Sequence, residues 1–216
     1  MANPIFWTNV GIDVQTALAT AITITNISKA STGVVSYSGA VDPSNGDYIV
    51  LTVNGMNEVN DRIFRVANVN GAANTLELEG EDTTAYQTFV SGSMQVITFG
   101  ASMTTAQTIN VTGGEAEYAD VTTVHDLVRK RVPTVVSPLS LSMDNLFDLT
   151  DPAFIELNKA YKAKAKRAVR LRFGTGAKML LTGYASAAGV PTGQAQGVVQ
   201  MKIGIEAQNM PTVYAT

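Results

Sequence analysis

The sequence predicts a mainly β protein with one short α-helix and a small β-barrel in its first half. Short segments rich in β-branched and aromatic residues recur along most of the 216 residues, and several of them alternate apolar with polar side chains. Clusters of glycine, proline, asparagine and aspartate separate these segments, as they do at turns. Only the stretch after residue 150 shows apolar residues at the period of an amphipathic helix.

Two segments make up the first half of the chain. Residues 4–27 alternate loosely and end in the β-branched run Thr23–Ile27, so they predict one or two strands, with Asp13 as their only charged residue. Residues 28–98 contain short strand-like segments separated by turn signals and show no helical period, which predicts a small closed or nearly closed β-barrel. The expected strands are Val34–Ser38, Tyr48–Val53, Arg62–Ala67, Thr75–Glu79 and Ser93–Phe99.

The barrel segment resembles the small β-barrel of the first catalytic-cysteine half-domain of ubiquitin-activating enzymes, a module that also recurs in bacteriophage virion proteins. The matching features are Gly46-Asp47 before a strand, Gly55-Met56 with Asn60 after it, Phe64 with Val66, and Leu76-Glu77-Leu78 before Asp82. The resemblance does not imply ubiquitin chemistry, because the chain has no cysteine.

The middle of the chain predicts two strands joined by a charged loop. In Glu115–Val124, Glu115 and Glu117 share one strand face, and Tyr118 lies on the other. The loop His125–Pro133 follows, and Thr134–Met143 predicts an edge strand or one kinked at Pro138.

The stretch from Thr150 to Ala207 predicts a helix followed by three strands. Thr150 or Asp151 can cap the helix, and Pro152 suits its first position. Strands are expected where the period changes to two, around residues 168–173, over Lys178–Ser186 and over Val199–Glu206, with a Gly/Ala-rich loop before the last. The side chains predicted to form the core of helix and first strand are Phe154, Leu157, Tyr161, Val169, Leu171 and Phe173.

Composition argues against several kinds of chemistry. The chain has no cysteine and a single histidine, His125, so we expect no metal site, no cofactor and no catalytic triad. Gly174-Thr175-Gly176 joins two strands and opens no helix, which does not suit a phosphate-binding loop. No apolar run is long enough to span a bilayer, and no signal peptide is recognisable. We therefore expect a soluble protein made inside the cell that is not an enzyme.

The net charge of −3 is unevenly distributed. The acidic block in residues 28–99 consists of Asp42, Asp47, Glu58, Asp61, Glu77, Glu79, Glu81 and Asp82. The basic stretch consists of Lys159, Lys162, Lys164, Lys166, Arg167, Arg170, Arg172 and Lys178. Opposite blocks could orient neighbouring copies of a self-assembling subunit, or the lysines could simply line a solvated helix face. A third interpretation is a DNA-binding β protein that uses the basic stretch to neutralise phosphates.

The C-terminal half resembles the major tail tube proteins of long-tailed, lambda-like bacteriophages. In that family a short helix leads into an R-x-R-F-x-x-G strand and turn, a further strand, a Gly/Ala loop and a last strand. Here Arg170-Leu171-Arg172-Phe173, Leu181-Thr182-Gly183-Tyr184, and Val198–Glu206 with Asn209-Met210-Pro211 follow this order. Glu115–Val124 and Thr134–Met143 are similar to the long hairpin that the family projects from its sandwich.

The resemblance implies a tail-tube β-sandwich or barrel with one short α-helix and a projecting long hairpin, plus a small inserted β-barrel. The expected division is 1–27 with 99–216 as the core and 28–98 as the insertion. It implies a structural virion protein whose copies form stacked, hexameric rings, the conduit for DNA during ejection. The partners expected are further copies, the tape measure, tail terminator and distal tail proteins, and passing DNA, without membrane insertion.

Roles for individual residues follow from the same resemblance. Glu115 and Glu117 are expected to face the lumen, because an acidic wall repels phosphate. The loop is expected to mediate contacts between rings through His125, Asp126, Arg129, Lys130 and Arg131. The acidic barrel is expected outside the tube. The protein would be located in the virion tail and assembled in the cytoplasm of the host bacterium.

Overall fold

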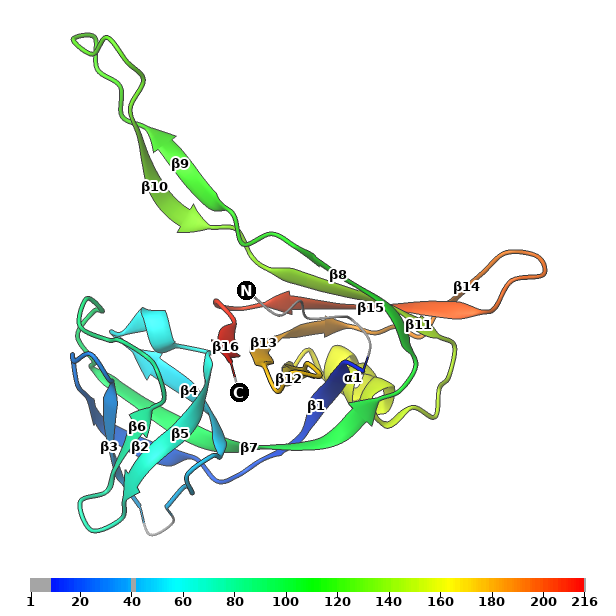
Figure 1. The fold of residues 1–216 in the computed structure, drawn as a ribbon, viewed down its shortest axis with the longest axis horizontal. Coiled ribbons are helices and arrows are strands. Elements are labelled where there is room, and N and C mark those ends of the chain that lie inside the picture. The colour runs from blue at the N-terminus through cyan, green and yellow to red at the C-terminus, as the bar shows by residue number, and fades with distance from the viewer. Residues whose placement is uncertain (1–8, 40–41, 216) are drawn as a thin grey trace.

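The computed structural model describes residues 9–39 and 42–215 and confirms a mainly β fold with one helix (Figure 1). Twelve of the strands follow one hydrogen-bonded path, β2-β3-β6-β5-β4-β7-β1-β12-β13-β15-β11-β8. β14, Pro191–Thr192, and β16, Thr212–Tyr214, pair beside this path with β15 and β13. The path divides into a small closed barrel and a larger core sheet, with a long hairpin extending from the latter.

Six strands close the small barrel. They are β2 (Ile22–Ile27), β3 (Val34–Ser38), β4 (Tyr48–Asn54), β5 (Ile63–Asn70), β6 (Thr75–Leu78) and β7 (Ser91–Met103), and the pairing of β2 with β7 closes the ring. Its interior is filled by fully buried side chains, among them Val35, Leu51, Phe64 and Met94. The barrel strands therefore begin at Ile22; the division of the chain into domains at residues 27 and 28 stays a prediction.

The core sheet shares β7 with the barrel. Residues 91–96 of β7 pair with β4, and residues 97–103 pair with β1, Gly11–Leu18. The sheet continues through β12 (Lys166–Arg172), β13 (Lys178–Ser186), β15 (Gln200–Ala207), β11 (Ser140–Leu146) and β8 (Ala106–Thr112). A short 3-10 helix, η1 (Asn57–Val59), follows β4 in the barrel.

The single α-helix, α1 (Pro152–Ala163), covers the core sheet. Its N-cap is Asp151, whose carboxylate accepts hydrogen bonds from the backbone N–H groups of Ala153 and Phe154 at 2.9 and 3.1 Å. The other oxygen of Asp151 accepts a bond from the N–H of Thr104, which ties the start of the helix to the turn between β7 and β8. The helix ends at Ala163 and is capped by Lys164, which adopts the left-handed conformation.

The predicted core residues divide into three groups. Phe154, Leu157, Val169 and Leu171 are buried in one cluster with β1, β11 and β15, and Phe173 is half-buried against it. Tyr161, in contrast, is 44 % exposed, so its assignment to the core is wrong. The helix buries Phe154, Leu157 and Ala160, and the next residue points about 100° further around the helix axis.

β12 buries side chains in two different clusters, one on each side of the strand. Ala168, on the face opposite Val169, is buried in a third cluster together with Ile63, Ile97, Leu180 and Tyr214. This cluster lies between the barrel and the core sheet, so β12 buries side chains on both of its faces. Alternation of apolar and polar residues along a strand therefore does not prove that one face of the strand is exposed to solvent.

The barrel is fixed to the core by specific bonds as well as by this cluster. The N–H of Arg65 donates to the Tyr214 hydroxyl at 2.7 Å, and the Asn209 amide donates to the carbonyl of Asn60 at 2.7 Å. Lys166 forms an ion pair with Asp61 at 2.7 Å. The C-terminal strand and its preceding turn therefore hold the barrel against the sheet.

The long hairpin begins as part of the core sheet and leaves it at a bend (Figure 1). β8 pairs with β11 up to Thr112 and Ser140. Beyond the bend, β9 (Ala116–Asp120) and β10 (Arg131–Val136) form a separate two-stranded sheet. A Cβ atom at Gly113 would lie 2.0 Å from the Pro138 carbonyl oxygen, so the bend requires glycine there. The strand break at Pro138 agrees with the predicted kink.

The hairpin strands differ in length from those predicted. β9 ends at Asp120 rather than Val124, and β10 begins at Arg131, inside the predicted loop. β8 was not predicted as a strand, and five of its seven residues, including Gln107 and Thr108, are exposed. Within residues 9–39 and 42–215, no helix has the length and apolar character needed to cross a membrane.

Candidate assembly surfaces

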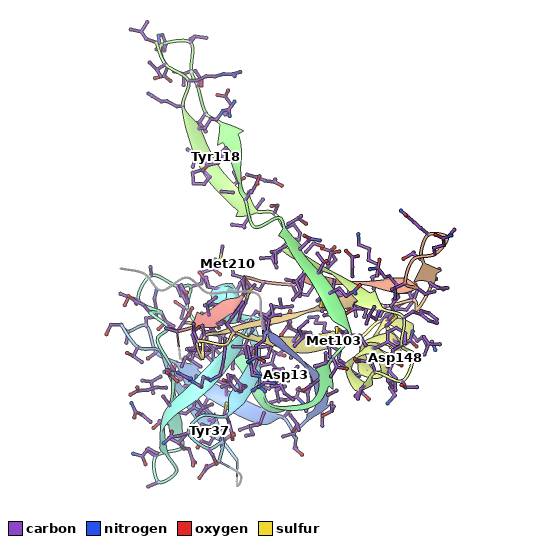
Figure 2. All side chains as sticks on the ribbon, turned by 45° about the vertical axis from the view of Figure 1, so that its right-hand side comes forward. Asp13, Tyr37, Met103, Tyr118, Asp148 and Met210 are labelled. Atoms are coloured by element: carbon purple, nitrogen blue, oxygen red, sulfur yellow. The ribbon has the colours of Figure 1, made fainter. Side chains whose placement is uncertain are left out.

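The ribbon formed by β9 and β10 lies apart from the rest of the molecule. Asp120, Ala119 and Tyr118 face Arg131, Val132 and Pro133 across the pair. Every residue of both strands is exposed, including Tyr118 at 60 % and Val135 at 59 % (Figure 2). Two strands without a third layer are at best marginally stable in water, so this ribbon is a candidate contact surface.

The two faces of the ribbon carry different side chains. Tyr118 and Pro133 occupy one face, and Glu117 shares the other with Ala119 and Val132. Glu115 lies just before β9, where its N–H donates to the Ser137 hydroxyl at 3.1 Å. Both glutamates are exposed, and neither has an ion pair within the described residues. Their direction relative to a lumen stays a prediction, because it depends on neighbouring copies.

The tip of the hairpin is organised by its own polar side chains. Asp126 accepts hydrogen bonds from the backbone and hydroxyl of Thr123, both at 2.9 Å, and pairs with Lys130. The Lys130 ammonium and the Thr123 donors hold the pKa of Asp126 below its usual value. Arg129 pairs with Asp120 at 3.2 Å. All five predicted ring-contact residues thus lie at or next to the tip: Asp126 and Lys130 pair with each other, Arg129 pairs with Asp120, and His125 and Arg131 are exposed.

Three apolar side chains of the same tip are almost fully in solvent. Val124 is 96 %, Leu127 103 % and Val128 74 % exposed. We call these three residues the apolar tip. The sequence analysis stressed the charges of this loop and missed its apolar residues, Leu127 and Val128, and it placed Val124 at the end of a strand.

A second group of exposed apolar side chains lies at the other end of the core sheet. The N–H of Phe147 bonds to the carbonyl of Val199 at 3.0 Å, and Leu149 lies beside Gly189, next to Val190. Phe147 is 36 % exposed, Leu149 51 %, Val190 64 % and Val199 48 %. They come from two loops that are distant in sequence, so no local pattern predicts the group.

Four of the eight residues of the basic stretch form internal ion pairs. Lys159 pairs with Glu156, Lys166 with Asp61, and both Arg170 and Arg172 with Asp13. Half of the stretch is thus already matched by carboxylates of the same chain. A phosphate backbone would have to compete with these pairs, so the arrangement disfavours the DNA-binding interpretation.

Asp13 is the most buried charge of this group, at 2 % exposure. It accepts bonds from Arg170 at 2.8 and 3.0 Å, from Arg172 at 2.5 and 2.9 Å, and from the Ser102 hydroxyl at 2.8 Å. Burial alone would raise the pKa of Asp13, but the bonds from Arg172, Ser102 and Arg170 together lower it below its usual value. Arg170 also stacks over Phe99 at 4.6 Å and Tyr48 at 5.3 Å, which links the core to the barrel.

Within the described ranges, no group of three or more His, Cys, Asp or Glu residues could hold a metal ion. A comparison with protein families gives one match: the family described as phage tail tube protein, TTP, over residues 54–216, well over half of the chain. A search of curated proteins found no match. The family match covers β5, β6 and β7 of the barrel, the whole hairpin, the helix and the C-terminal strands.

Proposed function

Because the chain belongs to the phage tail tube protein family, a structural family of the virion tail, we propose that its copies form stacked hexameric rings through which DNA is ejected. Assembly with itself and with other tail proteins is implied by the family. The ring number and the role in ejection are our proposals, as are specific contacts with the tape measure, tail terminator and distal tail proteins and assembly in the host cytoplasm.

The observation that carries the proposal is the unsupported hairpin ribbon. In a monomer, the Tyr118 face of this two-stranded ribbon would leave Tyr118 and Val136 exposed to water, and exposed apolar area of this kind is unfavourable. Packing against a neighbouring copy removes this cost. The outer edge of β8, which ends the strand path, is a second feature suited to such a contact, since an unpaired edge is completed by a strand of another chain.

Within this assembly we assign the glutamates Glu115 and Glu117 to the lumen. A conduit for DNA must not bind phosphate, and two exposed carboxylates without cationic partners on the described chain are suited to an inner wall. The face with Tyr118 and Pro133 would then pack against protein. The tip with His125, Asp126, Arg129, Lys130 and Arg131 reaches furthest from the core and is assigned to contacts between rings.

The small barrel, which the sequence analysis expects as an insertion at residues 28–98, is proposed to lie outside the tube. Its carboxylates are used internally: Glu81 pairs with Arg62, Glu79 with Arg65, and Asp42 accepts a bond from Tyr37. Its relation to the ubiquitin-activating-enzyme module, suggested by sequence features such as Gly46-Asp47 and Gly55-Met56, is itself a proposal. A rigid outer domain of this kind is suited to decoration or to contact with the host surface.

Electron microscopy of the purified protein tests the proposal. We expect rings or tubes with a uniform bore. A matched variant in which residues 114–137 are replaced by a two-residue turn should keep the folded barrel and core but remain monomeric. A wild-type chain that stays monomeric at high concentration would contradict the proposal.

A further inference from the structure

We propose that a cavity between the small barrel and the core sheet binds an uncharged polyol of the size of a monosaccharide. The cavity has a volume of about 280 Å³; residues of β1, β12 and β13 line it from the core, and residues of β4 and β7 line it from the barrel. Since β7 runs through both parts of the molecule, a single chain forms the whole site (Figure 1). The inference therefore goes beyond the proposed tube assembly and does not depend on it.

The core side of the cavity carries two buried polar side chains with unused hydrogen-bonding groups. Thr182 is 7 % exposed, and its hydroxyl oxygen is buried without a hydrogen-bond partner. Gln15 is 6 % exposed; its carboxamide oxygen accepts a bond from the N–H of Ala168 at 3.0 Å, and its amide nitrogen donates to no group of the described residues. Buried polar groups without partners are unfavourable, so a ligand that bonds to them gains affinity.

A small residue leaves room between these two side chains. Ala168 of β12 lies opposite Thr182 of β13 in the strand register, and it also lines the cavity. Its methyl group is too short to reach the barrel wall formed by β4. The space above it is therefore open to a ligand, and the polar groups of Thr182 and Gln15 lie beside it.

The charged groups of the cavity neutralise each other. Lys166 and Asp61 both line it and form an ion pair at 2.7 Å. The Asn60 amide lies 3.4 Å from the same carboxylate oxygen. An ionised ligand would have to break this pair or enter a site without net charge, and its own desolvation would not be compensated. The cavity therefore favours an uncharged ligand.

Hydroxyl groups suit this lining, because each can both donate and accept a hydrogen bond. The lining offers the two kinds of partner together, namely amide and ammonium donors and a carboxylate acceptor. Leu18, Val50 and Val53 add apolar surface for the C–H groups of the same ligand. The volume equals that of about nine water molecules and lies just below the range of pockets for drug-sized ligands, which suits a single sugar ring.

A titration of the full chain with glucose, galactose, mannose and ribose, followed by ligand-observed NMR, tests the site. We expect saturable binding of at least one of these sugars and weaker binding of glucuronate, because glucuronate carries a carboxylate. Thr182→Val removes the unpartnered hydroxyl and keeps the shape of the side chain. It should weaken binding about three- to tenfold, which is the effect of one neutral hydrogen bond.

The matched control is Thr212→Val. Thr212 is also buried and its hydroxyl also has no partner, but it does not line the cavity. This control should bind sugar as the wild type does.

A second variant acts at the rim of the cavity, where a larger side chain does not disturb the core. Leu18 is 40 % exposed, so Leu18→Trp should close the entrance and abolish binding. Val90→Trp, at an exposed barrel residue that does not line the cavity, should leave binding unchanged. Circular dichroism checks that each variant is folded.

Three results overturn the inference: none of the four sugars binds, Thr182→Val binds as tightly as the wild type, or Leu18→Trp still binds. Tighter binding of glucuronate than of glucose would overturn the assignment of an uncharged ligand. The methyl glycoside of the sugar that binds best distinguishes two sources of the same chemistry. Its binding supports the terminal residue of a glycan as the ligand, whereas its failure to bind supports a free sugar.

Discussion

At the scale of residues, one buried carboxylate connects segments that are far apart in the chain. Asp13 of β1 lies opposite Arg170 of β12 in the strand register and also binds Arg172 and, on β7, Ser102. Two arginines on one strand face would repel each other and point into solvent without it. The single charge of the first 27 residues therefore determines how the R-x-R strand of the C-terminal half is held.

Asp13→Asn should lower the free energy of unfolding by about 2–3 kcal/mol, because two arginines, one of them largely buried, lose their counter-charge. Denaturant unfolding followed by circular dichroism measures this loss. The matched control Asp120→Asn removes a carboxylate from the exposed pair with Arg129 and should leave the stability nearly unchanged.

The pH dependence of this loss follows from the lowered pKa of Asp13. A carboxyl whose pKa is lower in the folded than in the unfolded chain contributes its stabilisation above its usual pKa of 3.8, and the contribution disappears as the pH falls through the lowered value. The difference between wild type and Asp13→Asn should therefore be largest near neutral pH and shrink below pH 3.8. A difference that grows towards acid would refute the assignment.

At the scale of elements, the outer part of the hairpin receives no stabilising contact from a covering layer of its own chain. Its lower part, β8 with β11, belongs to the core sheet, while the ribbon of β9 and β10 has no covering layer. The tip closes itself with the Lys130–Asp126 and Arg129–Asp120 pairs. A ribbon with an ordered tip and no partner in its own chain has the properties of a connector between copies.

Replacing Arg129, Lys130 and Arg131 with alanine should give folded subunits that fail to polymerise. The substitutions remove both the charges proposed to meet the next ring and the pairs that close the tip. Size-exclusion chromatography with electron microscopy measures polymerisation, and circular dichroism checks folding.

The matched control for this triple variant replaces the exposed lysines Lys29, Lys162 and Lys202 with alanine. It makes the same change in net charge at positions remote from the tip, so it should polymerise normally. Normal tubes from the tip variant would refute the role of the loop.

At the scale of the whole molecule, the barrel and core behave as one body. β7 runs through both, the third apolar cluster lies between them, and Tyr214 and Asn209 bond across the junction. Among the described residues, the barrel exterior and the hairpin are surfaces left for other molecules. In the proposed tube, this rigidity would fix the orientation of the barrel relative to the bore.

Replacing Glu115 and Glu117 with lysine should slow DNA ejection without blocking assembly. The change turns two negative charges per copy into two positive charges, and a positive wall would retain phosphate. Ejection from phage that carry the variant, followed by the release of a DNA-binding dye, measures the rate. The matched control with glutamine at both positions removes charge without adding attraction and should have a smaller effect. An unchanged rate with lysine would argue against a lumen position.

The sequence by itself determined the local elements. The strands Val34–Ser38 and Lys178–Ser186 have the predicted bounds, and α1 begins at Pro152 after the Asp151 cap as predicted. These features depend on alternation, turn chemistry and capping, which act between residues close in the chain. The sequence also showed that residues 159–178 are basic. It did not show that several of these residues form internal ion pairs, because carboxylates such as Asp13 and Asp61 are distant in sequence.

Only the tertiary structure decided which surfaces are buried and which are left exposed. It paired Asp13 with residues of β12, covered both faces of that strand and turned Tyr161 outward. The physical reason is the same in each case: burial and long-range pairing depend on which elements pack together, and the residues of one element do not specify the neighbour that covers them.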